Sequence, residues 1–160
     1  MTRPNATPIV EGFALGPFAT NCYLVRCGGE AWVVDVSFEP GPMIERARET
    51  GDRITRILLT HAHVDHIAGL AEARRAFPEA LVAIHPAERS WLANPELNLS
   101  VALGEPFSTE PSEDTLEDGQ TLEIGGSTWR VVHTPGHSPG GVTLHCPDAG
   151  LALVGDTLFE

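Results

Sequence analysis

The feature that most constrains this chain is a dense cluster of metal-binding residue types: His61, His63, Asp65 and His66. An apolar run over residues 57–59 precedes the cluster and a helical pattern follows it, so the cluster connects a buried strand to a helix. The first two histidines are two positions apart, so in extended backbone their rings point to one side. Imidazole and carboxylate are common ligands of zinc and similar divalent metals. The cluster therefore predicts a metal site rather than a polar loop.

The size and composition of the chain indicate one folded domain. It has 160 residues, with 42% apolar and 20% charged side chains, which is ordinary for a globular protein. This length supports one hydrophobic core and is short for two, so we predict a single domain over residues 1–160. No apolar run approaches the roughly 18 residues of a membrane span, and residues 1–5 lack the apolar core of a secretory signal. We expect a cytoplasmic protein without a membrane partner.

The charge balance excludes several function classes. Ten arginines, no lysine and 22 acidic residues give a net charge of −12. Proteins that bind phosphate backbones carry positive patches, so we expect no nucleic-acid partner. The absence of lysine also removes Schiff-base and P-loop chemistry. A small-molecule substrate remains.

The three cysteines, Cys22, Cys27 and Cys146, carry no signal of chemistry. An odd number without a C-x-x-C pair predicts reduced thiols rather than disulfides. Cys22 and Cys27 fall on one predicted strand with an odd spacing, so they should face opposite sides of it. We expect all three in the core.

The first half of the chain alternates strand and helix signals. A Gly-Gly pair at positions 28 and 29 separates two β-rich runs, which is a strong hairpin signal. Gly51 and Pro78 mark two expected helix ends. The predicted elements are strands over residues 21–27, 30–36, 54–59 and 80–84, and helices over residues 40–50, 66–77 and 86–92.

Two polar residues at strand exits have open or structural roles. Asp35 ends the second strand of the hairpin; it either orients a metal-bound histidine from behind or is only a turn residue. His85 follows the strand over residues 80–84, and we expect it to be a surface or structural histidine rather than a ligand.

The second half begins with a loop-rich connection and continues with strands. Residues 94–119 contain three prolines and several acids but no arginine, which is typical of a solvated linker or of a flap over a site. The last predicted strand is apolar on both sides and therefore needs cover on both faces, although no helical pattern follows it. The predicted strands cover residues 121–124, 128–133, 142–146 and 151–154.

Two further segments add potential ligands. Residues 133–141 form a turn whose prolines fix the backbone around His137 and whose glycines leave its approach clear. His137 is a candidate third imidazole beside the first two histidines of the cluster, and three histidines with one open position are typical of catalytic zinc. We expect His133 to brace the turn through hydrogen bonds. Asp156 ends the last strand with a carboxylate that can bridge two cations.

Together these segments resemble the metallo-β-lactamase superfamily. Residues 61–66, the turn over residues 134–137 and the Gly-Asp-Thr-Leu-Phe sequence at 155–159 carry the resemblance. Residues 16–23 and the same C-terminal sequence resemble its hydroxyacylglutathione hydrolase branch, which is type II glyoxalase-like. The resemblance implies an α+β fold: an αββα sandwich of two mostly antiparallel sheets with outer helices and the metals at one edge.

The resemblance also implies a ligand set and cofactors. The implied ligands are His61, His63 and His137 for a first metal, Asp65 and His66 for a second, and Asp156 as a bridge. The cofactor would be zinc, one or two ions per chain, although iron or manganese suits the same ligands. Asp65 would also be catalytic, because it can steer the proton of the attacking water.

The chain departs from the family pattern at its C-terminal end. Family members carry one more histidine ligand downstream of the bridging aspartate, and no histidine follows Asp156 here. The resemblance implies that the second half is incomplete and lacks the C-terminal part, including outer helices and groups that contact glutathione in the glyoxalases. Either the chain is truncated or another subunit covers the gap, and an uncovered sheet would favour homo-oligomers.

The resemblance implies a metal-dependent hydrolase of a thioester such as a hydroxyacylglutathione, acting through metal-bound hydroxide. One alternative is a mononuclear iron persulfide dioxygenase of the same superfamily, which needs only two histidines and an aspartate. Another is a metal-binding fragment without turnover. A lactamase is less favoured because no export signal is present, and a nuclease conflicts with the charge.

Overall fold

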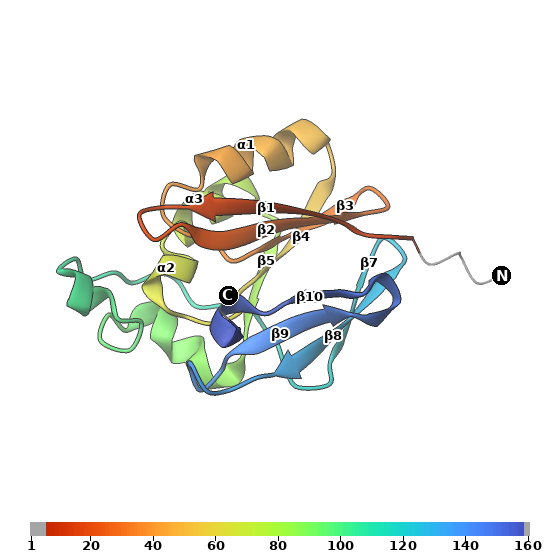
Figure 1. Ribbon diagram of the computed structural model, residues 1–160. Coiled ribbons are helices and arrows are strands. Elements are labelled where there is room, and N and C mark those ends of the chain that lie inside the picture. Colours follow the sequence, from red (N-terminus) through yellow and green to blue (C-terminus); the bar gives the residue numbers. More distant parts are fainter. Residues whose placement is uncertain (1–5, 159–160) are drawn as a thin grey trace.

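The computed structural model describes residues 6–158 as two β-sheets that lie face to face (Figure 1). The predicted α+β sandwich is therefore confirmed. Residues 1–5, used above to predict localisation, and Phe159 of the C-terminal motif lie outside the described residues. Within residues 6–158, no helix is both long enough and apolar enough to cross a membrane.

The first sheet combines antiparallel and parallel pairing. Its order is β1-β2-β3-β4-β5-β6; the pairs from β1 to β3 are antiparallel and those from β3 to β6 are parallel. This sheet is therefore mixed. Its parallel neighbours need crossover connections, which the helices supply. The strands are β1 (Ile9–Leu15), β2 (Thr20–Cys27), β3 (Glu30–Val34), β4 (Arg53–Leu58), β5 (Leu81–Ile84) and β6 (Asp114–Thr115).

Local signals placed the hairpin and the first helix correctly. Cys27 pairs with Glu30 across the two glycines, and both glycines have positive φ, 57° and 84°, as a two-residue hairpin turn requires. Helix α1 (Gly41–Thr50) ends at Gly51, which adopts the left-handed conformation with φ of 70°.

The single helix predicted over residues 66–77 is wrong, because the structure contains two helices there. Helix α2 (Val64–Ile67) begins inside the histidine cluster, and α3 (Leu70–Ala76) follows after a break at Gly69. The Gly69 N–H donates to the Val36 carbonyl at 3.0 Å, and a Cβ at this position would collide with the Ser37 carbonyl. The helix breaks here because its backbone packs directly on the loop after β3.

The connection over residues 94–119 is ordered rather than a solvated linker. It follows the 3₁₀ helix η1 (Pro86–Ala93), contains a second one, η2 (Ser100–Leu103), and contributes β6 to the first sheet. The side chain of Asn98 is buried and donates to the carbonyls of Trp91 and Phe107 at 3.1 and 3.0 Å. These hydrogen bonds hold the connection against the domain.

The second sheet is antiparallel throughout, with the order β10-β9-β8-β7. Its inner face packs on the first sheet through an edge-to-face contact between Trp32 and Trp129, whose ring centroids lie 6.1 Å apart. Short 3₁₀ turns, η3 (Pro147–Ala149) and η4 (Gly155–Thr157), flank its last strand. The strands are β7 (Thr121–Ile124), β8 (Ser127–His133), β9 (Val142–Cys146) and β10 (Leu151–Leu153).

Two hydrophobic cores lie on opposite faces of the first sheet. One fills the space under α1 and α3 and contains Cys22; the other lies between the sheets and contains Cys27 and Cys146. Cys22 and Cys27 therefore face opposite sides of β2, as predicted. All three cysteines are buried free thiols.

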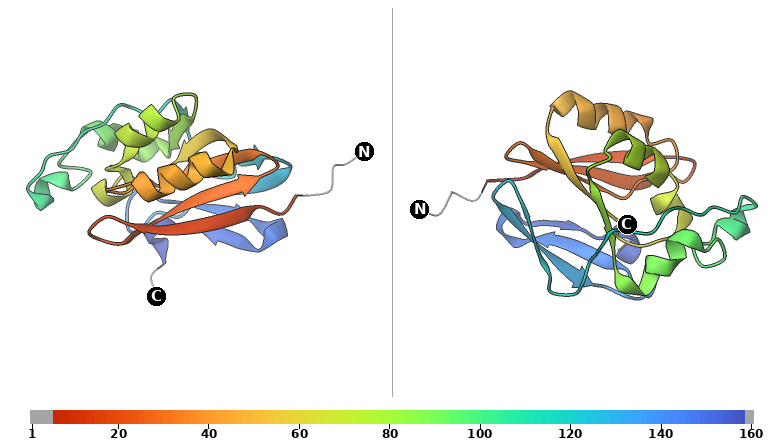
Figure 2. Two further views of the ribbon diagram at one scale, coloured as in Figure 1. Left: turned by 90° about the horizontal axis from the view of Figure 1, so that it is seen from above. Right: turned by 180° about the vertical axis from the view of Figure 1, so that it is seen from behind.

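The outer faces of the two sheets differ. Helices α1 and α3 cover the first sheet, whereas no helix of residues 6–158 lies over the outer face of the second (Figure 2). In β10, Leu153 is buried and Leu151 packs against the same core, so only Ala152 points outward. The prediction that this strand is apolar on both faces was therefore too strong. The outward side chains of this sheet are mostly polar or small: Thr121, Glu123, Thr128, Arg130, Val132, His145 and Ala152.

Candidate metal centre

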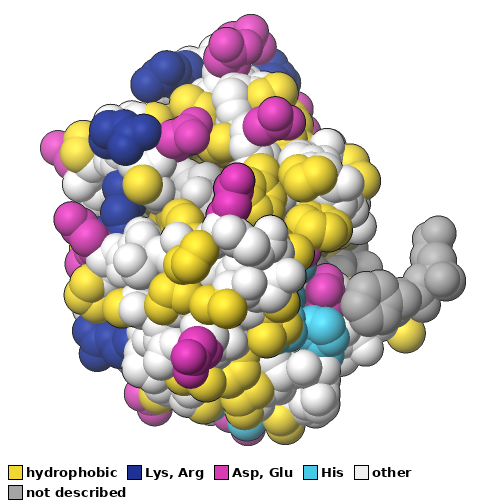
Figure 3. All heavy atoms as spheres, turned by 90° about the vertical axis from the view of Figure 1, so that its left-hand side faces the viewer, with side chains coloured by type: hydrophobic (Ala, Val, Ile, Leu, Met, Phe, Trp, Pro, Cys, Tyr) yellow, Lys and Arg dark blue, Asp and Glu magenta, His cyan; other side chains and the backbone are white. Residues whose placement is uncertain are grey.

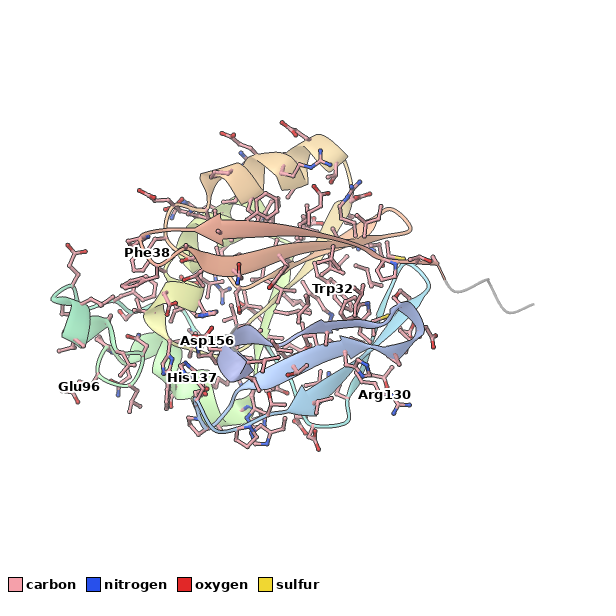
Figure 4. The ribbon with its side chains drawn as sticks, viewed as in Figure 1. Trp32, Phe38, Glu96, Arg130, His137 and Asp156 are labelled. Atoms are coloured by element: carbon pink, nitrogen blue, oxygen red, sulfur yellow. The ribbon has the colours of Figure 1, made fainter. Side chains whose placement is uncertain are left out.

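Separate segments bring their imidazole and carboxylate groups together at one end of the two sheets. His61, His63, Asp65 and His66 come from the loop after β4 and from α2. His137 lies in the turn between β8 and β9, and Asp156 lies in η4. Figure 4 shows the last two next to each other at the end of the second sheet.

Three histidines form one potential metal-binding group. The ligand atoms of His61, His63 and His137 all lie within 4.8 Å of one another. Nδ1 of His63 is 2.9 Å from Nε2 of His137, and the His61 ring centroid is 4.7 and 5.1 Å from the other two. Three nitrogen donors at this spacing suit one zinc-like ion with a fourth position open. The structure thus brings together the residues predicted for the first metal.

A second group forms around the carboxylate of Asp156. Its ligand atoms and those of His61 and His66 lie within 4.8 Å of one another. Oδ1 of Asp156 is 3.1 Å from Nε2 of His66, whereas Oδ2 is 3.4 Å from Nε2 of His137. The two oxygens therefore face different histidines, as a bridging carboxylate does. Asp65, predicted here with His66, is outside this group, although its Oδ2 is 3.4 Å from Nε2 of His66.

The environment of these histidines fits a cation between them. Nε2 of His61 is buried and has no hydrogen-bond partner among residues 6–158. Nε2 of His66, also buried, faces carboxylate oxygens of Asp156 and Asp65 at 3.1 and 3.4 Å. Leaving a buried polar atom unpaired costs about 1–3 kcal/mol, and coordination of a cation would satisfy Nε2 of His61. Burial, helped by the neighbouring His66 and His63, lowers the pKa of His61 to about 2. His61 is therefore neutral, which is the form that binds metal.

His66 titrates differently because carboxylates surround it. Burial alone lowers the pKa of His66, but the charge of Asp35 and a hydrogen bond with Asp156 outweigh it and raise this pKa to about 10. The hydrogen bond to His66 in turn lowers the pKa of Asp156. The negative groups around His66 thus favour positive charge at this position, whether a proton or a metal ion carries it.

Asp35 orients two of the histidines from behind. It is fully buried, and its Oδ2 accepts hydrogen bonds from Nδ1 of His66 at 2.8 Å and from Oγ1 of Thr60 at 2.7 Å. Because the Thr60 hydroxyl donates to Asp35, its oxygen accepts from Nδ1 of His61 at 3.1 Å. Both rings are then held with Nε2 towards the cluster. Of the two roles that the sequence left open, the structure supports the orienting one.

The remaining two predicted histidines are structural. Nε2 of His133 donates to the Pro139 carbonyl at 2.9 Å and so braces the turn, as expected. His85 stacks flat on His133, with ring centroids 4.2 Å apart, and its Nδ1 accepts from the Ala87 N–H. Neither histidine joins the two groups.

Sequence reasoning missed three residues that contact the cluster. Oγ1 of Thr20 donates to Oδ2 of Asp65 at 2.9 Å, and the ring of Trp91 stacks on that of His63 at an angle of 30°, with centroids 6.0 Å apart. Glu88 is fully buried beside the cluster. The sequence contains a signal for Thr20, because this residue lies in the stretch over residues 16–23 that resembles the hydroxyacylglutathione hydrolase branch. It contains no signal for Glu88, because an acidic residue in a short helix cannot be told from an exposed acidic residue by sequence.

A cavity of about 600 Å³ opens beside the second group. This volume is within the range of small-molecule sites. Figure 3 views the molecule from the left-hand side of Figure 1 and shows histidine and acidic side chains at the surface next to hydrophobic ones. The lining residues are Phe18, Ala19, Thr20, Asn21, Tyr23, Asp65, His66, Val154, Gly155, Asp156 and Leu158.

Comparison with known proteins identifies the relatives of this chain. The profile of the metallo-beta-lactamase superfamily matches residues 15–160. The probable metallo-hydrolase YqgX of Bacillus subtilis is 35% identical over 91% of this chain and 69% of its own length. The hydroxyacylglutathione hydrolase of Cereibacter sphaeroides is 38% identical over 82% of this chain. The chain spans only 44% of the length of that enzyme.

Solved structures of other proteins have the same fold as this chain. The B3 metallo-beta-lactamase BLEG-1 superposes with a TM-score of 0.88 and 36% identity, over 95% of this chain and 74% of that one. The structure of TTHA1623 in a di-iron-bound form gives a TM-score of 0.79 and 32% identity, over 94% of this chain and 73% of that one. Both structures share the fold of this chain.

Proposed function

This chain belongs to the metallo-beta-lactamase superfamily, and on that premise we propose that it is a metal-dependent hydrolase of a thioester such as a hydroxyacylglutathione. The observation that carries the proposal is the convergence of three imidazoles and the Asp156 carboxylate beside a cavity of small-molecule size. The identity with a hydroxyacylglutathione hydrolase supports a thioester as the substrate. The strongly acidic composition favours a small molecule over a nucleic acid.

The residues of the chain divide the chemical work. A divalent metal bound here would lower the pKa of water from about 15.7 to about 7 and polarise a substrate carbonyl. His61, His63 and His137 would hold it, and Asp156 would bridge to a second ion. Asp65 lines the cavity with its carboxylate fixed by Thr20, so a carboxylate oxygen of Asp65 takes the proton of the attacking water.

The space around the site suits an extended substrate. Phe18 and Tyr23 line the cavity with Asp65 and His66. Phe18 also lines an adjoining, mainly apolar groove of about 470 Å³. A thioester whose acyl and thiol parts extend in opposite directions would contact both spaces, with its carbonyl beside the metal-binding groups.

A β-lactam is the second candidate substrate. The 36% identity and the TM-score of 0.88 with the BLEG-1 metallo-beta-lactamase favour it, and hydrolysis of a cyclic amide needs the same attack on a carbonyl. Iron is a candidate metal beside zinc, because TTHA1623 is 32% identical and has a di-iron-bound form. Iron would also suit persulfide dioxygenase chemistry.

Assays of the purified chain with defined metals test these proposals. The chain is loaded separately with zinc, iron and manganese and assayed with S-lactoylglutathione, with nitrocefin, and for oxygen uptake on glutathione persulfide. We expect metal-dependent thioester hydrolysis, with a decrease of roughly 100-fold or more in H63A and D65N. Hydrolysis of nitrocefin alone would support the lactam. Metal binding without any turnover would contradict the enzyme proposal.

A further inference from the structure

One buried carboxylate joins the two loops that carry the histidines. Glu88 lies in η1 and is 0% exposed. Its Oε2 accepts from the Ala62 N–H at 2.6 Å, and its Oε1 accepts from the Gly140 N–H at 2.7 Å. Ala62 lies between the first two histidines of the cluster, and Gly140 follows His137 by three positions. A single side chain therefore spans the strand-exit loop of the first sheet and the turn of the second.

The turn approaches this carboxylate closely because residue 140 is glycine. A Cβ at Gly140 would lie 2.9 Å from Cγ of Glu88 and 3.2 Å from its Oε1. Both partners of the carboxylate are backbone N–H groups, so Glu88 fixes the positions of the loops themselves. Hydrogen bonds to a carboxylate are short and stronger than those between neutral groups.

Two further side chains, one in this helix and one directly before it, contact the same two loops. The ring of Trp91 stacks on that of His63 at an angle of 30°, with centroids 6.0 Å apart. His85, at the start of the helix, stacks on His133, which in turn donates to the carbonyl of Pro139 next to Gly140. Each loop is thus contacted at one point besides its hydrogen bond to Glu88.

The two loops need such a connection because the first group draws on both sheets. His63 and His137 are 74 positions apart, yet Nδ1 of one lies 2.9 Å from Nε2 of the other. Metal–ligand distances tolerate only about ±0.2 Å, so a small shift of the turn would weaken coordination. The backbone bond from Val142 N to Thr60 O, 2.9 Å, links the same loops at one other point.

We infer that Glu88 is a positioning residue that fixes the distance between His63 and His137 and thereby sets the affinity of the first group for its metal. This inference rests on the proposed metal site but concerns a residue that contacts no metal ligand side chain through a hydrogen bond. Glu88 acts through the backbone at Ala62 and Gly140.

Zinc titration of the E88Q variant tests this inference. The side-chain amide of this variant would place an NH₂ group against one of the two backbone N–H groups, so one loop must move away. We expect the zinc affinity, measured by competition with a chromophoric chelator, to fall about 10–100-fold, as for other residues that orient ligands. The matched control is E96Q, the same change at an exposed residue that Figure 4 shows far from His137. It should bind zinc like the wild type.

A double variant separates positioning from general destabilisation. In an H137A background, E88Q should cause no further loss of the residual zinc affinity, because the histidine that it positions is absent. The absorption spectrum of the cobalt-loaded protein should change in E88Q and not in E96Q. An equal loss of zinc affinity in both backgrounds, or an unchanged affinity in E88Q, overturns the inference.

A second variant serves if E88Q does not fold. G140A leaves the carboxylate in place but pushes the turn away through its added Cβ, and Gly140 does not have a positive φ that would strain alanine. G140A should also weaken zinc binding about 10-fold or more, and unchanged affinity overturns the inference. Wild-type protein that binds no zinc would instead overturn the metal site itself, and this inference with it.

Discussion

The two sheets contribute to the metal centre in different ways. The first sheet supplies four groups from one continuous segment. Two of them, His61 and His66, have side chains that are only 3% exposed and are held by Thr60 and Asp35. The second sheet supplies His137 and Asp156 from two separate turns, with 36% and 24% of their side chains exposed. Neighbours within the first half therefore fix two of its ligands, whereas the second half must dock correctly to complete the site.

Docking depends on contacts of several kinds. Trp32 and Trp129 pack between the sheets, Val142 N donates to Thr60 O, and Glu88 connects the loops. The identity of the ligands is therefore set by local sequence, whereas their placement depends on contacts between the two sheets. Variants in each sheet test this difference between the two halves. The variant with the largest expected effect removes a ligand that both groups share.

Removing His61 should abolish metal binding in both groups. His61 belongs to the histidine group and to the Asp156 group, whereas His63 belongs only to the first. We expect H61A to retain no zinc after gel filtration and H63A to retain the second ion. Elemental analysis of both variants measures this. Equal zinc content in the two variants would show that the groups are not arranged around a shared histidine.

Truncating Trp129 should undock the second sheet. The side chain is fully buried between the sheets, and Trp→Ala changes in a core cost about 3–5 kcal/mol. Urea unfolding of W129A should show this loss. The control V132A, on the outer face of the same strand, should change the unfolding free energy by at most about 0.5 kcal/mol. A loss below about 1 kcal/mol in W129A would contradict the docking role of this core.

Replacing Asp35 should weaken metal binding within the first half alone. In D35N an NH₂ group replaces one carboxylate oxygen, so the side chain loses either the bond from the Thr60 N–H to Oδ1 or the bonds from Thr60 Oγ1 and His66 Nδ1 to Oδ2. We expect zinc affinity to fall about 10–100-fold, measured by competition titration. D52N is the matched control, because Asp52 pairs with Arg26 away from the site. Similar affinities in D35N and D52N would disprove the orienting role.

The smallest effect concerns acid stability far from the metal centre. Hydrogen bonds and charge from Arg46, and then from Arg26, hold the pKa of Glu11 below its ordinary value of 4.5. A lowered folded-state pKa gives stability that is present above pH 4.5 and lost as pH falls through the folded pKa. At neutral pH, E11Q should reduce the free energy of unfolding by less than about 1 kcal/mol relative to the wild type. This difference should shrink below pH 4.5 without any change in zinc affinity; a constant difference would contradict the assignment.

Local chemistry explains why parts of the fold could be predicted. Gly28 and Gly29 supply the positive φ of the hairpin turn, and Gly51 supplies the left-handed end of α1. The break at Gly69 escaped prediction because it depends on contact with the loop after β3, which is distant along the chain. The ordered connection over residues 94–119 escaped for a similar reason: the buried hydrogen bonds of Asn98 have no sequence signature.

Residue type and local backbone were enough to nominate the groups of the centre, and the family resemblance implied that they meet. The spacing of His61, His63 and His66, and the turns around His137 and Asp156, are local features of the chain. How these groups are divided and held became clear only from the folded molecule. Asp65 lies beside His66 but outside the bridging group, and Glu88 lies between two loops. The physical reason is that those contacts depend on how the two sheets dock, and docking is a property of packed surfaces rather than of any one segment.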